Sequence, residues 1–139
     1  MKVKELMTNP AISVSGEDTV CETARIMQAH NIGSVPVING KGQVVGIVTD
    51  RDIVVRNTSK GDDSCATKVK EIMTSGVDTV SPEADMKDVI TRMGNDKVRR
   101  LPVVDAGVLI GMLTIGDVAT EDAYKTEAAD ALAEISEKS

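Results

Sequence analysis

Two stretches of the chain carry glycine, threonine and aspartate at the same spacing. Gly46–Asp52 reads GIVTDRD, and Gly111–Asp117 reads GMLTIGD. A threonine hydroxyl both donates and accepts hydrogen bonds, whereas an ionised aspartate only accepts, through two oxygens. A carboxylate therefore suits two adjacent donors, such as the vicinal hydroxyls of a ribose.

The elements around these stretches must position the threonine and the aspartate. The apolar residues before each threonine predict a strand, and each aspartate falls in the first turn of a predicted helix. Glycine inside a strand usually marks a close approach of another backbone. A helix N-terminus favours an anion, which suits a phosphate beside a ribose. Threonine and aspartate are also ordinary helix caps at such junctions. The sequence leaves both interpretations, cap and sugar site, open.

The two stretches belong to a duplicated chain. Lys2–Thr8 reads KVKELMT, and Lys68–Thr74 reads KVKEIMT. Further along, VPVI of 35–38 matches LPVV of 101–104. A repeat this regular indicates that each copy forms one structural unit. We predict four segments: repeat one over 1–58, a linker over 59–67, repeat two over 68–122 and a C-terminal helical tail over 123–139.

Each repeat predicts the order β-α-β-β-α, so the fold class is α+β, a mixed α/β protein. A short extended piece, 11–14 or 77–80, leads to Ser15 or Ser81, and each serine is expected to cap a helix. Two apolar strands follow, joined by hairpin turns. Helical spacing predicts buried helix faces in the two repeats: Val20, Ala24 and Met27 in the first, and Met86, Val89, Ile90 and Met93 in the second. A last helix, which packs on its own module or on a second copy, has its apolar residues at Tyr124, Ala128, Leu132 and Ile135.

The composition argues against several classes of protein. The 139 residues are 41% hydrophobic and 27% charged, as in ordinary globular proteins. The chain has one Tyr, no Trp and no Phe, and its net charge is −6, so we expect no nucleic-acid partner. It has no apolar run long enough to span a membrane and no signal-peptide pattern, so we expect a cytoplasmic protein without a membrane partner.

Cysteine and histidine usage argues against an enzyme and against a metal site. Cys21 and Cys65 show no C-x-x-C spacing and are too few for a disulfide framework, so we expect both thiols to be reduced. Cys21 falls near a predicted helix start, which can lower the pKa of a thiol, but we expect it to be an ordinary, unreactive residue. His30 is the only histidine and falls at a predicted helix end. No catalytic triad, Walker loop or Cys/His cluster is recognisable.

The repeats resemble a tandem pair of CBS domains, the regulatory module named after cystathionine beta-synthase and also called a Bateman module. The matching motifs are V-K-E-[LI]-M-T, NIGSVPVI with VRRLPVVD, and VVGIVTDRDIV with LIGMLTIGDVA. They run from Lys2 to about Ala119 with no attached enzyme, as in stand-alone prokaryotic CBS-pair proteins. The resemblance implies two units about a pseudo-two-fold axis, a homodimer, and two clefts that bind an adenosine-containing ligand such as AMP, ADP or ATP.

The resemblance also assigns roles to individual residues. Asp52 and Asp117 would hold ribose hydroxyls, and Thr49 and Thr114 would contact ribose or phosphate. Backbone and apolar groups of the first strand and the proline-containing strand would grip the adenine, which points to Val14 with Pro36 and to Val80 with Pro102. Phosphate would be bound by basic residues, namely Arg51, Arg99 and Arg100, although such charges are also common on solvated edges.

From the resemblance we expect a non-catalytic energy or metabolite sensor that requires no cofactor and takes an adenine nucleotide as its regulatory ligand. The alternatives are a sensor of S-adenosylmethionine or NAD, and a ligand-free module for dimerisation. Repeat one has Gly33–Ser34 where repeat two has Arg99–Arg100, and repeat two has Ile115–Gly116 where repeat one has Asp50–Arg51. We therefore expect unequal clefts, with Arg51 and Arg100 sharing a polyphosphate region.

Overall fold

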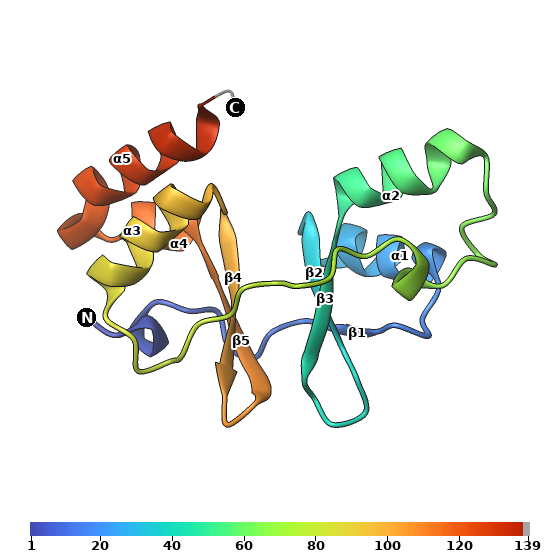
Figure 1. Ribbon diagram of the computed structural model, residues 1–139, viewed down its shortest axis with the longest axis horizontal. Helices are drawn as coiled ribbons and strands as arrows, with labels where there is room; N and C mark the ends of the chain where they lie inside the picture. Colours follow the sequence, from blue (N-terminus) through green and yellow to red (C-terminus); the bar gives the residue numbers. More distant parts are fainter. Residues whose placement is uncertain (138–139) are drawn as a thin grey trace. The chain divides into compact units, whose positions relative to one another are not determined.

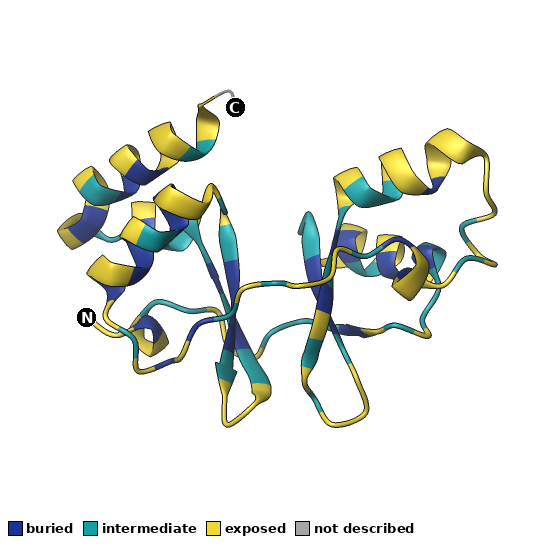
Figure 2. Ribbon diagram, viewed as in Figure 1, coloured by how far each residue is buried: buried dark blue, intermediate teal, exposed yellow. Residues whose placement is uncertain are grey.

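The chain divides into two compact units (Figure 1), and the computed structural model describes residues 1–137. The central unit is Ile12–Val77, and the terminal unit joins Met1–Ala11 to the chain from Asp78 onward. Figure 2 shows that each unit has its own buried residues, on its strands and on one face of its helices. The predicted α+β class is confirmed. Within the described chain, no helix is both long enough and apolar enough to cross a membrane.

The central unit has the predicted order of strands and helices. β1 (Val14–Ser15) pairs in parallel with β2 (Ser34–Ile38), which pairs antiparallel with β3 (Val44–Thr49). α1 (Val20–His30) connects β1 to β2, and α2 (Asp50–Arg56) follows β3 directly. Because the chain has no Phe or Trp, the core is aliphatic and consists of Val14, Val20, Met27, Val35, Val37, Val48, Val69 and Ile72.

The terminal unit follows the same order. Both first strands are shorter than predicted, since the strand expected over 11–14 is only Val14–Ser15 and that of the terminal unit is shorter still. The strand expected over 77–80 is reduced to one parallel bridge, in which the Val80 N–H donates to Pro102 O at 3.0 Å and the Val104 N–H donates to Val80 O at 2.9 Å. The next ladder bond would need an N–H at residue 82, which is a proline and has none. The other elements are α3 (Met86–Asp96), β4 (Arg100–Asp105), β5 (Val108–Thr114) and α4 (Ile115–Ala119).

The two long helices begin later than predicted. Thr19 caps α1 and Asp85 caps α3, each through a side-chain oxygen that accepts a backbone N–H of the first turn, at 3.1 Å and 2.8 Å. Ser15 and Ser81 were the predicted caps, but each hydroxyl accepts the N–H two residues later and so closes a tight turn before the helix. Ala24 is exposed, and the buried residues of α1 are Val20, Thr23 and Met27.

The two copies of the K-V-K-E-x-M-T motif are exchanged between the repeats, and we call Lys2–Thr8 and Lys68–Thr74 the exchanged segments. Lys2–Thr8 lies in the terminal unit, where Thr8 and Met112 exchange two backbone hydrogen bonds of 2.8 and 3.0 Å. Lys68–Thr74 lies in the central unit, where Thr74 and Ile47 exchange two backbone hydrogen bonds of 2.9 Å. The compact units therefore do not coincide with the sequence repeats.

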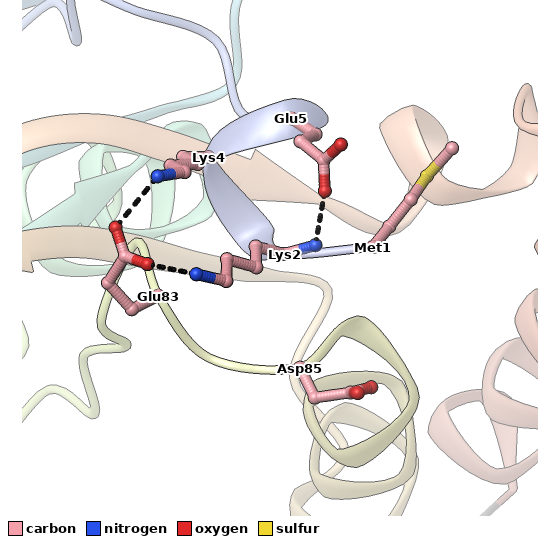
Figure 3. A pocket seen from close by; sticks show the side chains of 6 residues that line it. All are labelled: Met1, Lys2, Lys4, Glu5, Glu83 and Asp85. Atoms are coloured by element: carbon pink, nitrogen blue, oxygen red, sulfur yellow. Dashed lines mark hydrogen bonds and ion pairs between the residues drawn. The ribbon is translucent and has the colours of Figure 1, made fainter.

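Each exchanged segment is held on its outer side by one glutamate. Glu83 pairs with Lys2 at 2.6 Å and with Lys4 at 2.9 Å, beside a surface pocket of about 600 Å³ (Figure 3). The hydrogen bonds from these two lysines lower the pKa of Glu83 to about 2. Glu17 pairs with Lys68 and Lys70 in the same way, and its pKa is also lowered to about 2. All these side chains are about half exposed, so the ion pairs orient the segments more than they stabilise them.

The last helix packs on its own unit, which was one of the two predicted arrangements. α5 (Lys125–Ser136) contacts α3 and α4. Gly94 on α3 permits this contact, because a Cβ there would lie 3.2 Å from the Ala131 Cα. The predicted Leu132 is 40% exposed, and the buried residues of this region are Tyr124, Ala128 and Ala131. The last part of the predicted tail, 138–139, lies outside the described residues.

The glycine of the shared motif lies where an exchanged segment crosses a strand. A Cβ on Gly46 in β3 would lie 2.9 Å from Thr74 O and 2.6 Å from the Met73 sulfur. A Cβ on Gly111 in β5 would lie 2.8 Å from Thr8 O and 2.8 Å from the Met7 sulfur. These distances are shorter than real Cβ contacts, so each crossing needs a residue without a side chain.

We expect Gly46→Ala and Gly111→Ala each to lower the free energy of unfolding by about 2 kcal/mol, because the added methyl overpacks the crossing. Urea unfolding followed by circular dichroism measures the change. Gly40→Ala is the matched control, since no atom lies within 4 Å of a Cβ at Gly40, and it should change stability by less than about 0.5 kcal/mol. Equal losses at all three glycines would contradict this account.

Candidate functional site

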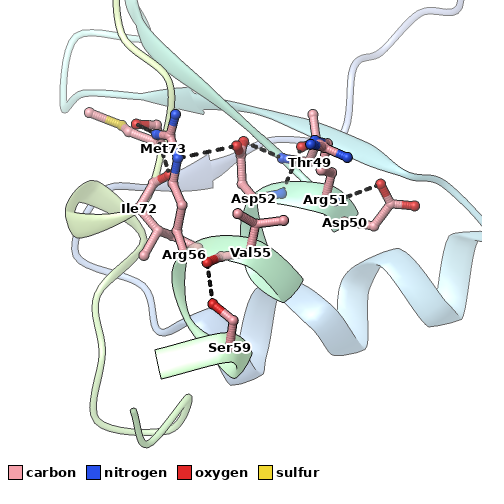
Figure 4. A network of polar contacts seen from close by, with 9 residues as sticks. All are labelled: Thr49, Asp50, Arg51, Asp52, Val55, Arg56, Ser59, Ile72 and Met73. Carbon is pink, nitrogen blue, oxygen red and sulfur yellow. Dashed lines mark hydrogen bonds and ion pairs between the residues drawn. The ribbon is translucent and has the colours of Figure 1, made fainter. Parts of the chain in front are cut away.

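Thr49 and Asp52 form a reciprocal pair of hydrogen bonds where β3 passes into α2. The Asp52 N–H donates to the Thr49 hydroxyl at 3.0 Å, and the Thr49 N–H donates to Oδ2 of Asp52 at 3.0 Å (Figure 4). Thr114 and Asp117 form the same pair between β5 and α4, at 3.1 and 3.0 Å. Both pairs are capping boxes, so the cap interpretation of the motif is confirmed.

Each capping box engages only one oxygen of its carboxylate. In both units the backbone amide of the threonine reaches Oδ2, so Oδ1 is the oxygen that the box does not engage. The Asp52 side chain is only 12% exposed, and the box fixes the direction in which its Oδ1 points. A carboxylate held in this way can accept a further donor without first being ordered. The cap and a sugar site are therefore compatible at one residue.

Arg56 links the Asp52 pair to an exchanged segment, and it is not among the site residues predicted from the sequence. Its Nε lies 3.8 Å from Oδ1 of Asp52, and its Nη1 donates to Ile72 O at 3.2 Å and to Met73 O at 3.3 Å (Figure 4). The i, i+4 spacing of Asp52 and Arg56 on one helix is the signal that could have found it. The matching position after Gly111 is Glu121, which cannot take this role.

The predicted adenine-binding residues lie in the cores of the two units. Val14 is 3% exposed and Val80 is 5% exposed, and Pro36 and Pro102 are also buried. Within each unit the structure brings the predicted residues onto neighbouring backbones, since β1 pairs with β2 and the Val80 N–H donates to Pro102 O. Because the side chains are buried, these strands would present mainly backbone groups to a ligand.

The predicted phosphate-binding arginines lie beside the threonine–aspartate pairs of their own units. Arg51 is exposed in the first turn of α2, within the Thr49–Asp52 box. Arg100 is the first residue of β4 and is half-buried, and it lies opposite Thr114 in the register of the β4–β5 pair. Arg99 is exposed, and its carbonyl accepts the N–H of the first α4 residue at 2.8 Å. The structure thus places each arginine next to one capping box.

The neighbours of the two capping boxes differ in charge. In the central unit Gly33 occupies the place of Arg99, and its carbonyl accepts the Asp50 N–H at 2.9 Å. The Asp50 carboxylate lies over Gly33, 3.0 Å from where a Cβ would be. At this one position the Thr49–Asp52 box has an acidic neighbour, Asp50 over Gly33, where the Thr114–Asp117 box has the basic residue Arg99. Among residues 1–137, no three His, Cys, Asp or Glu side chains gather as a metal site would require.

Comparison with known proteins gives consistent matches over most of the chain. The family model of the CBS domain matches residues 3–56 and again residues 69–124. The CBS domain-containing protein YhcV of Bacillus subtilis (strain 168) is 37% identical over 134 residues, which cover 96% of this chain and 94% of that protein.

Two solved structures have a similar fold. The structure of a Vibrio cholerae protein assigned to acetoin utilization (AcuB) has a TM-score of 0.81 at 29% identity, covering 99% of this chain and 98% of that one. The CBS domain pair of protein MJ0100, solved in complex with 5′-methylthioadenosine and S-adenosyl-L-methionine, has a TM-score of 0.79 at 27% identity, covering 91% of this chain and 98% of that one.

We expect Thr49→Ala and Thr114→Ala each to lower the free energy of unfolding by about 1 kcal/mol, because the first-turn N–H loses its acceptor. Thermal unfolding by calorimetry measures the loss. Thr126→Ala, at an exposed position in α5, is the control and should leave stability within about 0.5 kcal/mol. Unchanged stability in both cap variants would mean that the boxes do not hold the helix starts.

Proposed function

This chain belongs to the CBS domain family as a tandem pair, a regulatory module, and we propose that its threonine–aspartate pairs hold the ribose of an adenosine-containing ligand. An adenine nucleotide, AMP, ADP or ATP, is the ligand we put first. The observation that carries the proposal is the pair of matched capping boxes, in which Asp52 and Asp117 each keep Oδ1 outside the box. We propose no catalytic step for these residues.

The chemistry of a ribose fits a carboxylate held by its other oxygen. The two vicinal hydroxyls of a ribose are donors, and an ionised carboxylate accepts only. Oδ2 stays with the threonine N–H, while Oδ1 accepts one hydroxyl and directs the sugar toward the start of the helix. The threonine hydroxyl accepts the aspartate N–H and has its own proton left to donate to a ribose or phosphate oxygen.

The remaining parts of an adenine nucleotide would meet backbone and arginine groups. The adenine would lie against the backbones of Val14 and Pro36, or of Val80 and Pro102. Phosphates would be bound by Arg51 in one site and by Arg99 and Arg100 in the other, since guanidinium groups bind phosphate through paired hydrogen bonds. The different charges beside the two capping boxes support unequal sites.

A related module supports the choice of ligand class. The MJ0100 pair was solved with 5′-methylthioadenosine and S-adenosyl-L-methionine. Both molecules contain adenosine, and neither carries a phosphate. We therefore keep S-adenosylmethionine as an alternative to AMP, ADP and ATP, and we keep NAD as another because it also contains adenosine. A ligand regulates only when it binds two states of the protein unequally, and we propose a homodimer in the cytoplasm as the assembly whose states it would shift.

Asp52→Asn and Asp117→Asn should each weaken adenosine binding at one site by roughly 10- to 100-fold, because a hydrogen bond to a charged acceptor contributes about 1.5–3 kcal/mol. The amide oxygen of asparagine can still accept the threonine N–H, so the melting temperature should hardly change. Isothermal titration calorimetry with adenosine, AMP, ATP and S-adenosylmethionine measures the affinity. Asp130→Asn, at an exposed position in α5, is the matched control.

Two outcomes of that titration contradict the proposal. The first is that wild-type protein binds none of the four ligands, which favours a ligand-free module for dimerisation. The second is that both aspartate variants bind as tightly as the wild type, which removes the carboxylates from the site.

Arg51→Gln and Arg100→Gln should each lower the affinity for ATP by about 10-fold and leave that for adenosine unchanged, because each removes a charge-assisted contact to phosphate. The same calorimetry, run with both ligands, gives the ratio. Arg25→Gln, at an exposed position in α1, controls for the loss of one positive charge. Equal losses for ATP and adenosine would show that the arginines act on the fold and not on the phosphates.

A further inference from the structure

The two cysteines of the chain meet within the central unit. Cys21 is half-buried in the first turn of α1, and Cys65 is exposed in the segment that follows α2. The Cys21 N–H donates to Ser64 O at 2.9 Å, which places Cys21 beside the residue before Cys65, and the Cys65 side chain is a neighbour that raises the pKa of the Cys21 thiol. A backbone hydrogen bond to the residue next to Cys65 holds the two cysteine backbones close together, as a disulfide requires.

The backbone on both sides of this contact is fixed. The Val20 N–H donates to Thr67 O at 2.9 Å, which adds a second bond between the start of α1 and the same segment. On the other side, the Cys65 N–H donates to Oδ1 of Asp63 at 2.9 Å, and the Thr67 N–H donates to Asp63 O at 3.0 Å. The buried side chain of Asn57 donates to the Thr67 hydroxyl at 3.3 Å. The backbones that carry the two cysteines are therefore held next to each other in the reduced protein.

We propose that Cys21 and Cys65 are a modification site at which a peroxide forms a reversible intramolecular disulfide. The Cys65 thiol loses its proton and the thiolate attacks one peroxide oxygen. The O–O bond breaks, Cys65 becomes a sulfenic acid, and the released hydroxide takes up that proton and leaves as the first water. The Cys21 sulfur then attacks the Cys65 sulfur, its proton leaves with the hydroxyl as a second water, and the S–S bond forms. A dithiol reductant takes the bond back to two thiols.

The surroundings assign different roles to the two thiols. Cys65 is exposed, so it meets the oxidant first. The hydrogen bond with Cys65, followed by burial, raises the pKa of the Cys21 thiol, although the nearby Arg25 acts in the opposite direction. The helix start therefore does not activate Cys21. Cys21 stays a thiol next to its partner and acts as the resolving sulfur.

The crosslink would join the first turn of α1 to the segment that leads from α2 to the exchanged segment Lys68–Thr74. It would enclose α1, the β2–β3 hairpin and α2 in one covalent loop. A loop of this length takes much conformational entropy from the unfolded chain, so the oxidised central unit should be the more stable form. This inference does not depend on any ligand at the threonine–aspartate pairs. In a reducing compartment the bond would be transient.

The test uses the full chain, reduced and then treated with hydrogen peroxide. Remaining thiols are alkylated with iodoacetamide, and intact mass is measured without reductant. We expect a monomer about 2 Da lighter with no alkylation, restored by dithiothreitol to two alkylated thiols. We also expect the melting temperature of the oxidised form to rise by roughly 5–15 °C.

Cys21→Ser and Cys65→Ser separate the two roles. Cys21→Ser should leave Cys65 as a sulfenic acid that dimedone traps, and Cys65→Ser should leave Cys21 free for alkylation. Three outcomes would overturn the proposal: wild-type thiols that stay alkylatable after peroxide, disulfides found only between chains, or an oxidised monomer that melts no higher than the reduced one. The wild-type measurements decide the matter even if a variant folds poorly.

Discussion

The close approach of two backbones at Gly46 and Gly111 is the constraint on which both units depend. At each glycine an exchanged segment crosses a hairpin strand so closely that only a hydrogen fits. The crossing seats a valine of the segment, Val3 or Val69, in the core, where each is fully buried. Three residues after each glycine the strand ends in the threonine of a capping box, so the crossing and the candidate site share one short strand. Arg56 joins the same two features again, because it contacts both Asp52 and the backbone of the segment.

Most helices and strands of each unit could be predicted from local sequence patterns, and the predictions that were wrong have local causes. The predicted buried face of α3 is confirmed at Met86, Val89, Ile90 and Met93, since these residues are large and regularly spaced. The predicted caps at Ser15 and Ser81 fail because a serine hydroxyl serves a tight turn as readily as a helix start. The exchange of the segments could not be predicted from their residues. The two copies differ only at Leu6 and Ile72, so either hairpin would accept either copy on local grounds.

The candidate site shows why one motif supported two interpretations. A helix cap and a diol-binding carboxylate need the same residue types at the same junction, and sequence cannot separate two uses that occupy different oxygens of one side chain. What distinguishes the two copies is their surroundings. Asp50 beside Gly33 and Arg56 on the carbonyls of Ile72 and Met73 are contacts across elements, visible only once the chain is folded. Arg99 and Arg100, near Thr114, could be predicted as candidate site residues because their positive charge can be read directly from the sequence.

The exchange of the segments has a consequence for synthesis on the ribosome, where the chain emerges from its N-terminus. Lys2–Thr8 is made before Ile12–Val77, yet its partner Met112 is made long after the whole of Ile12–Val77 has emerged. Until Met112 has been made, Val3 has no core in which to be buried and stays in water. The β2–β3 hairpin, in contrast, is complete before Lys68–Thr74 is synthesised. The nascent chain thus carries Lys2–Thr8 next to an unpaired β3 strand, whose native partner is the later copy, Lys68–Thr74. Correct assembly requires that Lys68–Thr74, and not Lys2–Thr8, finally occupies that strand.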